Sequence, residues 1–169
     1  MNHLEIAQEL SRNKEVFRGL LHGVESRQYL WRPQPEKWCL LEILCHLYDE
    51  EREDFRMRVQ LVLQNPQLSL PPIDPQGWVT SRKYMEQDYD AMLDSFLNER
   101  DQSVLCLRGL RSPDWEQTYV HPRLGAMPAS LFLHNWLAHD YLHFRQITAT
   151  KYAYLKAHST DPLDYAGNW

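Results

Sequence analysis

The sequence predicts an all-α protein, a four-helix bundle, and three observations lead to this fold class. First, apolar residues recur at spacings of three and four over four long stretches, as one buried helix face requires. Second, the prolines cluster in the segments between these stretches. Third, no stretch shows the pattern of a multi-stranded sheet. The chain is therefore expected to form one helical domain over residues 1–169.

The first two helices are expected near residues 3–24 and 39–64. In the first, Leu4, Ala7 and Leu10 begin the apolar stripe, and Gly23 is a suitable C-terminal stop. The segment 28–37 is a linker, because its two prolines keep it extended. The second helix begins at Cys39, where Cys-Leu-Leu-Glu has the spacing of a capping box with cysteine in place of serine or threonine.

The segment from Asn65 to Gly77 contains four prolines and is expected to be an extended connection without helix. At about 3.1 Å per residue, a dozen such residues span roughly 37 Å, about the length of a 26-residue helix. The connection can thus return along the whole bundle. We therefore expect helix 79–108 to run in the same direction as helix 39–64, which gives an up-down-down-up arrangement with a long crossover.

The last third of the chain is expected to hold an irregular segment, a helix and a loop. Residues 111–127 contain breakers such as Pro113, Pro122 and Gly125, so no helix is expected there. The fourth helix is expected over 128–157, with Pro128 in the first turn, where proline is favoured. The tail from His158 to Trp169 is expected to be a loop.

Composition restricts the compartment and the partners. Hydrophobic residues make up 43% of the chain, which indicates a globular protein. No apolar run reaches the roughly 18 residues of a membrane span, and the polar N-terminus shows no signal peptide. The three cysteines are odd in number and form no CxxC motif, which favours reduced thiols. We therefore expect a cytoplasmic protein without a membrane partner.

The charge of the chain argues against nucleic-acid binding. The formal net charge is −5, and lysine and arginine form no block. Proteins that bind nucleic acids generally present a basic face or stripe. The expected ligand is accordingly a small molecule, not a nucleic acid.

The strongest chemical signal lies in the stretch 132–147, where His139 and His143 are four residues apart. On a helix they share one face at about 5–6 Å between Cβ atoms, and two such imidazoles can bind one divalent metal ion. They lie on an apolar stripe that faces other helices, whereas His134 lies about half a turn away from it. His46 in helix 39–64 is the natural third partner. The alternative is that these are core histidines without a metal.

Three neutral imidazoles would leave a divalent ion, zinc or nickel for this nitrogen donor set, with an open fourth position. A water bound there has its pKa lowered towards about 7, and a thiol is held as thiolate. Asp49 and Glu50, about one turn beyond His46, are candidates for an acceptor behind the metal ligand or for a catalytic base. Asp140, Glu51 and Arg145 fit ion pairs better than catalysis.

Three stretches of the chain together resemble the DinB/YfiT-like family of metalloenzymes. They are 32–52, with Trp38 ahead of the motif His46-Leu-Tyr-Asp-Glu-Glu; 119–125; and 136–147, with the motif His139-x-x-x-His143. The resemblance implies a four-helix bundle with two parallel neighbours and a long crossover, often as a homodimer. It also implies a metal held by three histidines, which correspond to His46, His139 and His143. Cys39 departs from the family, which commonly has serine there.

Function in the family is less uniform than fold. Some relatives are S-transferases that use bacillithiol, mycothiol or glutathione, and others resemble metal-dependent hydrolases or isomerases. The resemblance thus implies a metal-dependent enzyme, either an S-transferase with a low-molecular-weight thiol or a hydrolase. The alternative is a non-catalytic metal-binding or stress-response bundle that acts through dimerisation. An opening onto the fourth metal position favours the enzyme, and a site closed by protein groups favours the alternative.

Overall fold

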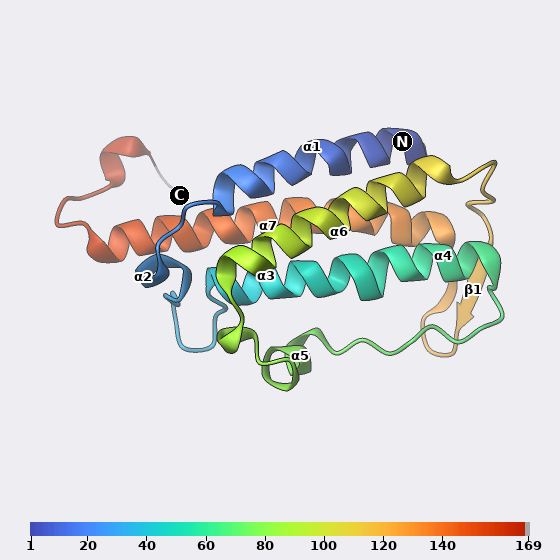
Figure 1. Cartoon of the computed structure of the whole chain (residues 1–169), viewed down its shortest axis with the longest axis horizontal. Helices are drawn as coiled ribbons and strands as arrows, with labels where there is room; N and C mark the ends of the chain where they lie inside the picture. Colours follow the sequence, from blue (N-terminus) through green and yellow to red (C-terminus); the bar gives the residue numbers. More distant parts are fainter. Residues whose placement is uncertain (168–169) are drawn as a thin grey trace.

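The computed structural model describes residues 1–167 and shows a bundle of four long helical segments (Figure 1). The expected all-α four-helix bundle is thus confirmed. The long segments are α1 (His3–Leu21), the continuous run α3 (Leu40–Asp49), η1 (Glu50–Phe55) and α4 (Arg56–Gln64), α6 (Tyr89–Gly109) and α7 (Ala129–His158). The shorter elements are α2 (Ser26–Tyr29), α5 (Pro75–Ser81), η2 (Tyr84–Glu86), β1 (Thr118–His121), β2 (Gly125–Pro128) and η3 (Asp164–Ala166).

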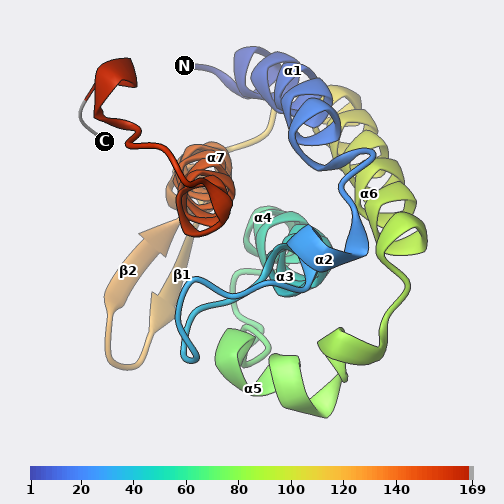
Figure 2. The same ribbon diagram turned by 90° about the vertical axis from the view of Figure 1, so that its left-hand side faces the viewer.

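The long helices follow the expected up-down-down-up order. In Figure 1, α1 and α7 run in one direction, and the α3–α4 run and α6 run in the other. The segment from Asn65 to Asp88 returns along the outside of the bundle between α4 and α6. In the end view of Figure 2, α7 lies beside α4 and α1 lies beside α6. The α3–α4 run and α7 are therefore antiparallel neighbours.

Local signals set the ends of α1. The Asn2 side chain accepts hydrogen bonds from the amides of Leu4 at 2.9 Å and Glu5 at 3.0 Å. The Glu5 carboxylate in turn accepts from the Asn2 amide at 2.7 Å, which completes a capping box. The helix ends before Gly23, whose φ of 71° suits glycine. The predicted stop at Gly23 is confirmed.

The second long helix contains a π-helical segment, η1, that the expectation of an ordinary helix over 39–64 did not include. It begins as expected, because the Glu42 carboxylate accepts a hydrogen bond from the Cys39 amide at 2.9 Å. The wider turn of the π-helix changes which side chains face inward. As a result Glu50, Glu51, Asp54 and Phe55 are all buried within six residues.

The prediction of one helix over 79–108 was wrong in its first part. A separate helix, α5, begins at Pro75, inside the segment 65–77 that was expected to be free of helix. The Asp74 carboxylate accepts from the Gly77 amide at 3.0 Å and thus caps α5. The chain then turns at Lys83, where φ is 51°, and α6 begins after a second cap, Asp88. These two aspartate caps favour two helices over one.

The expectation of a bundle without any sheet was wrong over residues 118–128, where β1 and β2 form an antiparallel hairpin. Thr118 pairs with Pro128 and His121 with Gly125, whose φ is 76°. Each strand has four residues, too few for an alternating pattern to stand out. Pro128 is consequently the residue before α7 and not part of its first turn.

The core consists of two apolar clusters, one towards each end of the bundle. The first includes Phe17, Leu44 and Phe96, and the second includes Leu10, Trp136 and Leu107. On every long helix, the residues between the two clusters include buried polar side chains. These are Asn13, His46, Asp49, Glu50, Glu51, Asp54, Arg100, Ser103, Asp140 and His143. The middle of the bundle is therefore a polar layer.

The tail beyond α7 follows the expected loop, with one short 3-10 turn, η3. Asn168 and Trp169, which that expectation also covered, lie outside the described residues.

Candidate metal centre

The polar layer brings together His46 from α3 with His139 and His143 from α7. The Nε2 atom of His139 lies 3.2 Å from Nε2 of His46 and 3.0 Å from Nε2 of His143. One ligand atom from each ring falls within 4.8 Å of the others, and no second group of this kind occurs in residues 1–167. Two ligands one helical turn apart define one edge of the site, and the facing helix supplies the third corner.

The three rings are held in their neutral form. Burial, together with the charge of His143, lowers the pKa of His46 to about 3. Burial and the charges of the other two rings lower the pKa of His139 to about 2, and burial lowers the pKa of His143 to about 4. A neutral imidazole has one unprotonated nitrogen, and that is the form that binds metal ions. The donor set is therefore ready for a cation at neutral pH.

The convergence of the three Nε2 atoms fits a divalent ion. Each neutral ring has a lone pair, and the three atoms cannot all satisfy one another with hydrogen bonds. An ion among them would satisfy all three, and the outer Nδ1 atoms would then carry the ring protons. His46 and His143 are almost fully buried, whereas His139 is partly exposed.

The outer face of the site holds the acceptor that His46 needs. Its Nδ1 atom lies 3.9 Å from Oε1 of Glu50, and neither atom has a hydrogen-bond partner in the described part of the chain. Burial, and next the charge of Asp54, raises the pKa of Glu50 to about 8. A metal-bound histidine commonly donates its second N–H to a carboxylate. Glu50 is placed to accept it after a small movement.

Aromatic rings form part of the walls. The Trp38 ring lies 4.9 Å from the His46 ring, and the Phe55 ring lies 5.0 Å from the His139 ring, between ring centroids. Trp136, by contrast, is 1% exposed and belongs to the second apolar cluster. The rings of Trp38 and Phe55 limit the directions from which a ligand can approach the three nitrogens.

The other candidate carboxylate, Asp49, is engaged elsewhere. Its oxygens accept a hydrogen bond from the Tyr84 hydroxyl at 2.6 Å and pair with Arg82 at 2.7 Å. These partners belong to η2 and to the turn after α5. Of the two carboxylates considered from the sequence, the structure places only Glu50 beside the histidines.

A buried ion-pair network lies next to the candidate site. Arg100 of α6 donates two hydrogen bonds to Glu51, at 2.8 and 2.9 Å, and two to Asp140, both at 2.7 Å. Asn13 of α1 also donates to Asp140, and Trp136 donates to Glu51. Asp140 and Glu51 are thus ion-pair partners between helices, while Arg145 is exposed.

Sequence reasoning did not identify Arg100, although a signal was present. Arg100 falls on the apolar stripe of α6, four residues after Phe96 and four before Val104. A charged residue at a core position of a helix requires a buried partner of opposite charge. The sequence predicts ion pairs for Glu51 and Asp140, but nothing in it indicates their common partner.

Comparison with known proteins assigns the family. A sequence model described as the DinB superfamily matches residues 9–147. The chain belongs to the DinB superfamily. Among curated proteins, none matches it.

One similar solved structure is that of YfiT from Bacillus subtilis, described as a probable metal-dependent hydrolase with an unusual four-helix bundle topology. The TM-score is 0.76 at 17% sequence identity, and the match covers 86% of this chain and 83% of YfiT. At this identity the similarity establishes the fold.

Within the described residues of this DinB-superfamily chain, no helix is both long enough and apolar enough to span a membrane.

The metal-free form of this DinB-superfamily protein should lose stability as the pH falls below 6.5, the ordinary pKa of histidine. Below that pH the unfolded chain takes up three protons at His46, His139 and His143, and the folded protein does not. Glu50 opposes this, because its raised pKa gives the folded state one proton more. The net difference approaches two protons, or about 2.7 kcal/mol per pH unit at most.

Urea unfolding of the chelator-treated protein between pH 7.5 and 5 measures this effect. A His143→Gln variant should show a weaker pH dependence, because one of the three lowered pKa values is absent. Equal stability across this range would contradict the neutral, buried state of the rings.

Proposed function

We propose that His46, His139 and His143 hold one divalent metal ion, zinc or nickel, and that the protein hydrolyses a small molecule with it. The observation that carries this proposal is the approach of the three Nε2 atoms to 3.0 and 3.2 Å, with His139 partly exposed. With three protein ligands, the bound ion would supply an open coordination position and a water whose pKa is lowered towards about 7. YfiT, which has a similar fold, is described as a probable metal-dependent hydrolase, and this supports the same reaction class.

The chain's own residues have separate roles in this proposal. The three imidazoles bind the ion, and Glu50 orients His46 by accepting a hydrogen bond from its Nδ1–H group. We regard Glu50 as a positioning residue, since it lies behind the ligand and not in front of it. Asp49 holds Tyr84 and Arg82 and has no role in the reaction.

A thiol-dependent transfer is the second candidate, because the same open position can hold a thiolate. Two of the three cysteines of the chain are poor sources of that thiolate. Burial raises the pKa of Cys39 to about 11 and that of Cys45 to about 12, so both stay protonated. In this reading the sulfur comes from a separate low-molecular-weight thiol. We further propose that the protein acts as a cytoplasmic homodimer, as DinB relatives often do.

Activity tests on the metal-loaded protein distinguish these proposals. The protein is stripped with a chelator, reloaded with zinc or nickel, and assayed on ester and amide substrates with and without added glutathione. We expect hydrolysis that is lost on stripping, restored by metal and independent of thiol. Glu50→Gln should lower the metal affinity about 10- to 100-fold, as removal of such a partner does elsewhere.

The other outcomes point to the alternatives. Turnover that requires the thiol would identify the transferase. Tight metal binding without turnover on any substrate would favour a non-catalytic metal-binding or stress-response bundle. Failure to bind metal at all would contradict the proposed centre.

A further inference from the structure

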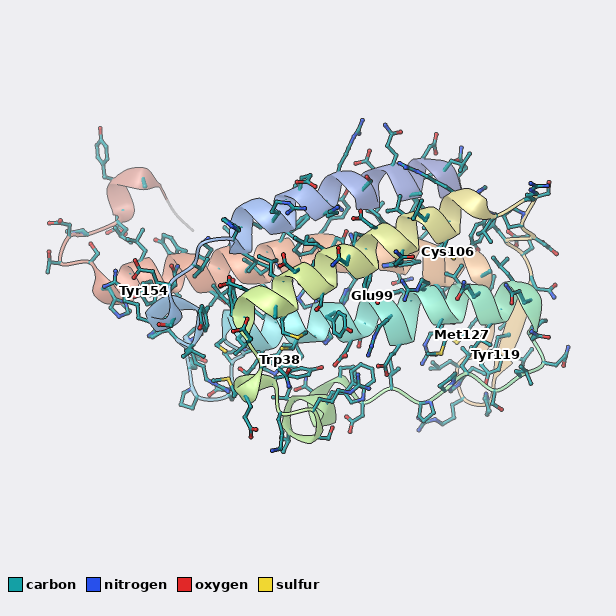
Figure 3. The ribbon with its side chains drawn as sticks, in the orientation of Figure 1. Trp38, Glu99, Cys106, Tyr119, Met127 and Tyr154 are labelled. Carbon is teal, nitrogen blue, oxygen red and sulfur yellow. The ribbon has the colours of Figure 1, made fainter. Side chains whose placement is uncertain are left out.

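A cavity of about 540 Å³ lies between the hairpin, the crossover segment and the facing sides of α4 and α7. Its lining includes Asp54 and Arg58 on the second long helix, Leu70 in the crossover, His121 and Arg123 on the hairpin, and Phe132 on α7. Figure 3 places Tyr119 and Met127, which also line it, near β1, well away from Trp38 along the bundle. This volume falls within the usual range for small-molecule sites.

Arg58 is fixed in the wall of this cavity. Its side chain is only 12% exposed, its Nε atom lies against Oδ1 of Asp54, and its Nη2 atom donates to the Pro71 carbonyl at 2.9 Å. The guanidinium carbon lies 5.9 Å from the centre of the Phe132 ring. Within residues 1–167, its Nη1 atom makes no hydrogen bond. A buried guanidinium with a free N–H is well placed to bind an anion.

The hairpin adds two more donors. Nδ1 of His121 accepts hydrogen bonds from the amides of Arg123 and Leu124, both at 3.1 Å. The proton of the neutral ring must therefore be on Nε2, which is then a donor. Arg123 forms no ion pair with any of the described residues, so its charge is available to a ligand.

The charges of the cavity match an organic monoanion. Arg58 and Arg123 contribute two positive charges and Asp54 one negative charge, which leaves +1 in a chain whose net charge is −5. A carboxylate would balance this charge, whereas a phosphate dianion would exceed it and be repelled by Asp54. Leu70 and Phe132 offer apolar surface to the rest of the ligand.

We propose that this cavity binds the carboxylate end of a small organic molecule with an apolar body, and that this molecule is the substrate of the metal centre. The assignment of this molecule as the substrate of the metal centre rests on the proposed function. Phe132 precedes His139 by seven residues on α7, an offset of about 10 Å along the helix axis. The carboxylate thus anchors one end of an extended substrate, and the reacting bond is at the other.

The test is calorimetric titration of the metal-free protein with 4-phenylbutyrate, with its neutral amide and with inorganic phosphate. We expect the carboxylate to bind, and the amide and phosphate to bind at least about tenfold more weakly. Arg123→Ala, on the exposed hairpin, should weaken carboxylate binding about tenfold, and Arg58→Met more strongly. Arg27→Ala, an exposed arginine on α2, is the matched control and should not change it.

Equal binding of acid and amide, tighter binding of phosphate, or carboxylate affinity unchanged in Arg123→Ala would overturn the proposal. Because no metal is present, the titration does not depend on the proposed hydrolysis. Carboxylate binding without turnover would contradict the proposed function and still support the carboxylate site. Turnover with a KM that Arg123→Ala does not alter would contradict the assignment of the bound carboxylate as the substrate, and would still support the proposed function.

Discussion

In the His143→Ala variant, tight metal binding should be lost while the bundle remains folded. Two imidazoles would remain, one from each of the facing helices, and they cannot complete the three-ligand set of a catalytic zinc-type site. Alanine is favoured within a helix, and the apolar clusters on both sides of the polar layer stay intact. Elemental analysis should therefore show metal in the unaltered protein and almost none in the variant, at equal helix content by circular dichroism.

His134→Ala is the matched control on the same helix. His134 is exposed, and its Nδ1 atom is 2.7 Å from the Ser130 carbonyl oxygen, away from the three converging rings. Its replacement should leave the metal content unchanged. Metal that stays bound in His143→Ala, or that disappears in His134→Ala, would show that other histidines form the site.

The parts of the fold that could be predicted from the sequence are those whose signal is periodic and local. The apolar stripes of α1 and α7 extend over five or more turns, so both helices were found close to their observed ends. The pair His139 and His143 was predicted in the same way, because residues four apart lie on the same face of a helix. The facing position of His46 required the bundle topology as well.

Other features depended on signals too short to read. The break between α5 and α6 is produced by two single caps, Asp74 and Asp88, and by one residue with positive φ, Lys83. The π-helical turn of η1 has no sequence pattern of its own, although it decides that both Glu50 and Glu51 are buried. The hairpin pairs only four residues with four.

The buried network around Arg100 could not be derived because its members are far apart in the sequence. Asn13, Glu51, Arg100 and Asp140 come from four different long helices and meet only when the bundle is assembled. The sequence shows each charge but not the packing that excludes water from it. The largest expected loss of stability in this protein arises from this part of the structure.

Replacing Arg100 with methionine should lower the free energy of unfolding by roughly 3–5 kcal/mol, the usual cost of removing one member of a buried ion-pair group. Methionine fills much of the space, but Glu51 and Asp140 would keep buried carboxylates without their four hydrogen bonds from the guanidinium. For a chain of this size the loss corresponds to a melting temperature lower by about 6–20 °C. Thermal unfolding in the presence of a chelator measures it without a contribution from bound metal.

Two further variants distinguish the cost of burying unpaired Glu51 and Asp140 carboxylates from the effect of losing an arginine as such. Arg108→Met, at an exposed position on the same helix, should change the melting temperature by no more than about 2 °C. Adding Glu51→Gln and Asp140→Asn to Arg100→Met should recover part of the lost stability, because an unpaired amide costs less to bury than an unpaired carboxylate. A triple variant less stable than Arg100→Met would mean that the two acids are stabilised by something other than Arg100. Equal melting temperatures for Arg100→Met and Arg108→Met would mean that the network adds nothing to the fold, and that the polar layer is there for the metal centre alone.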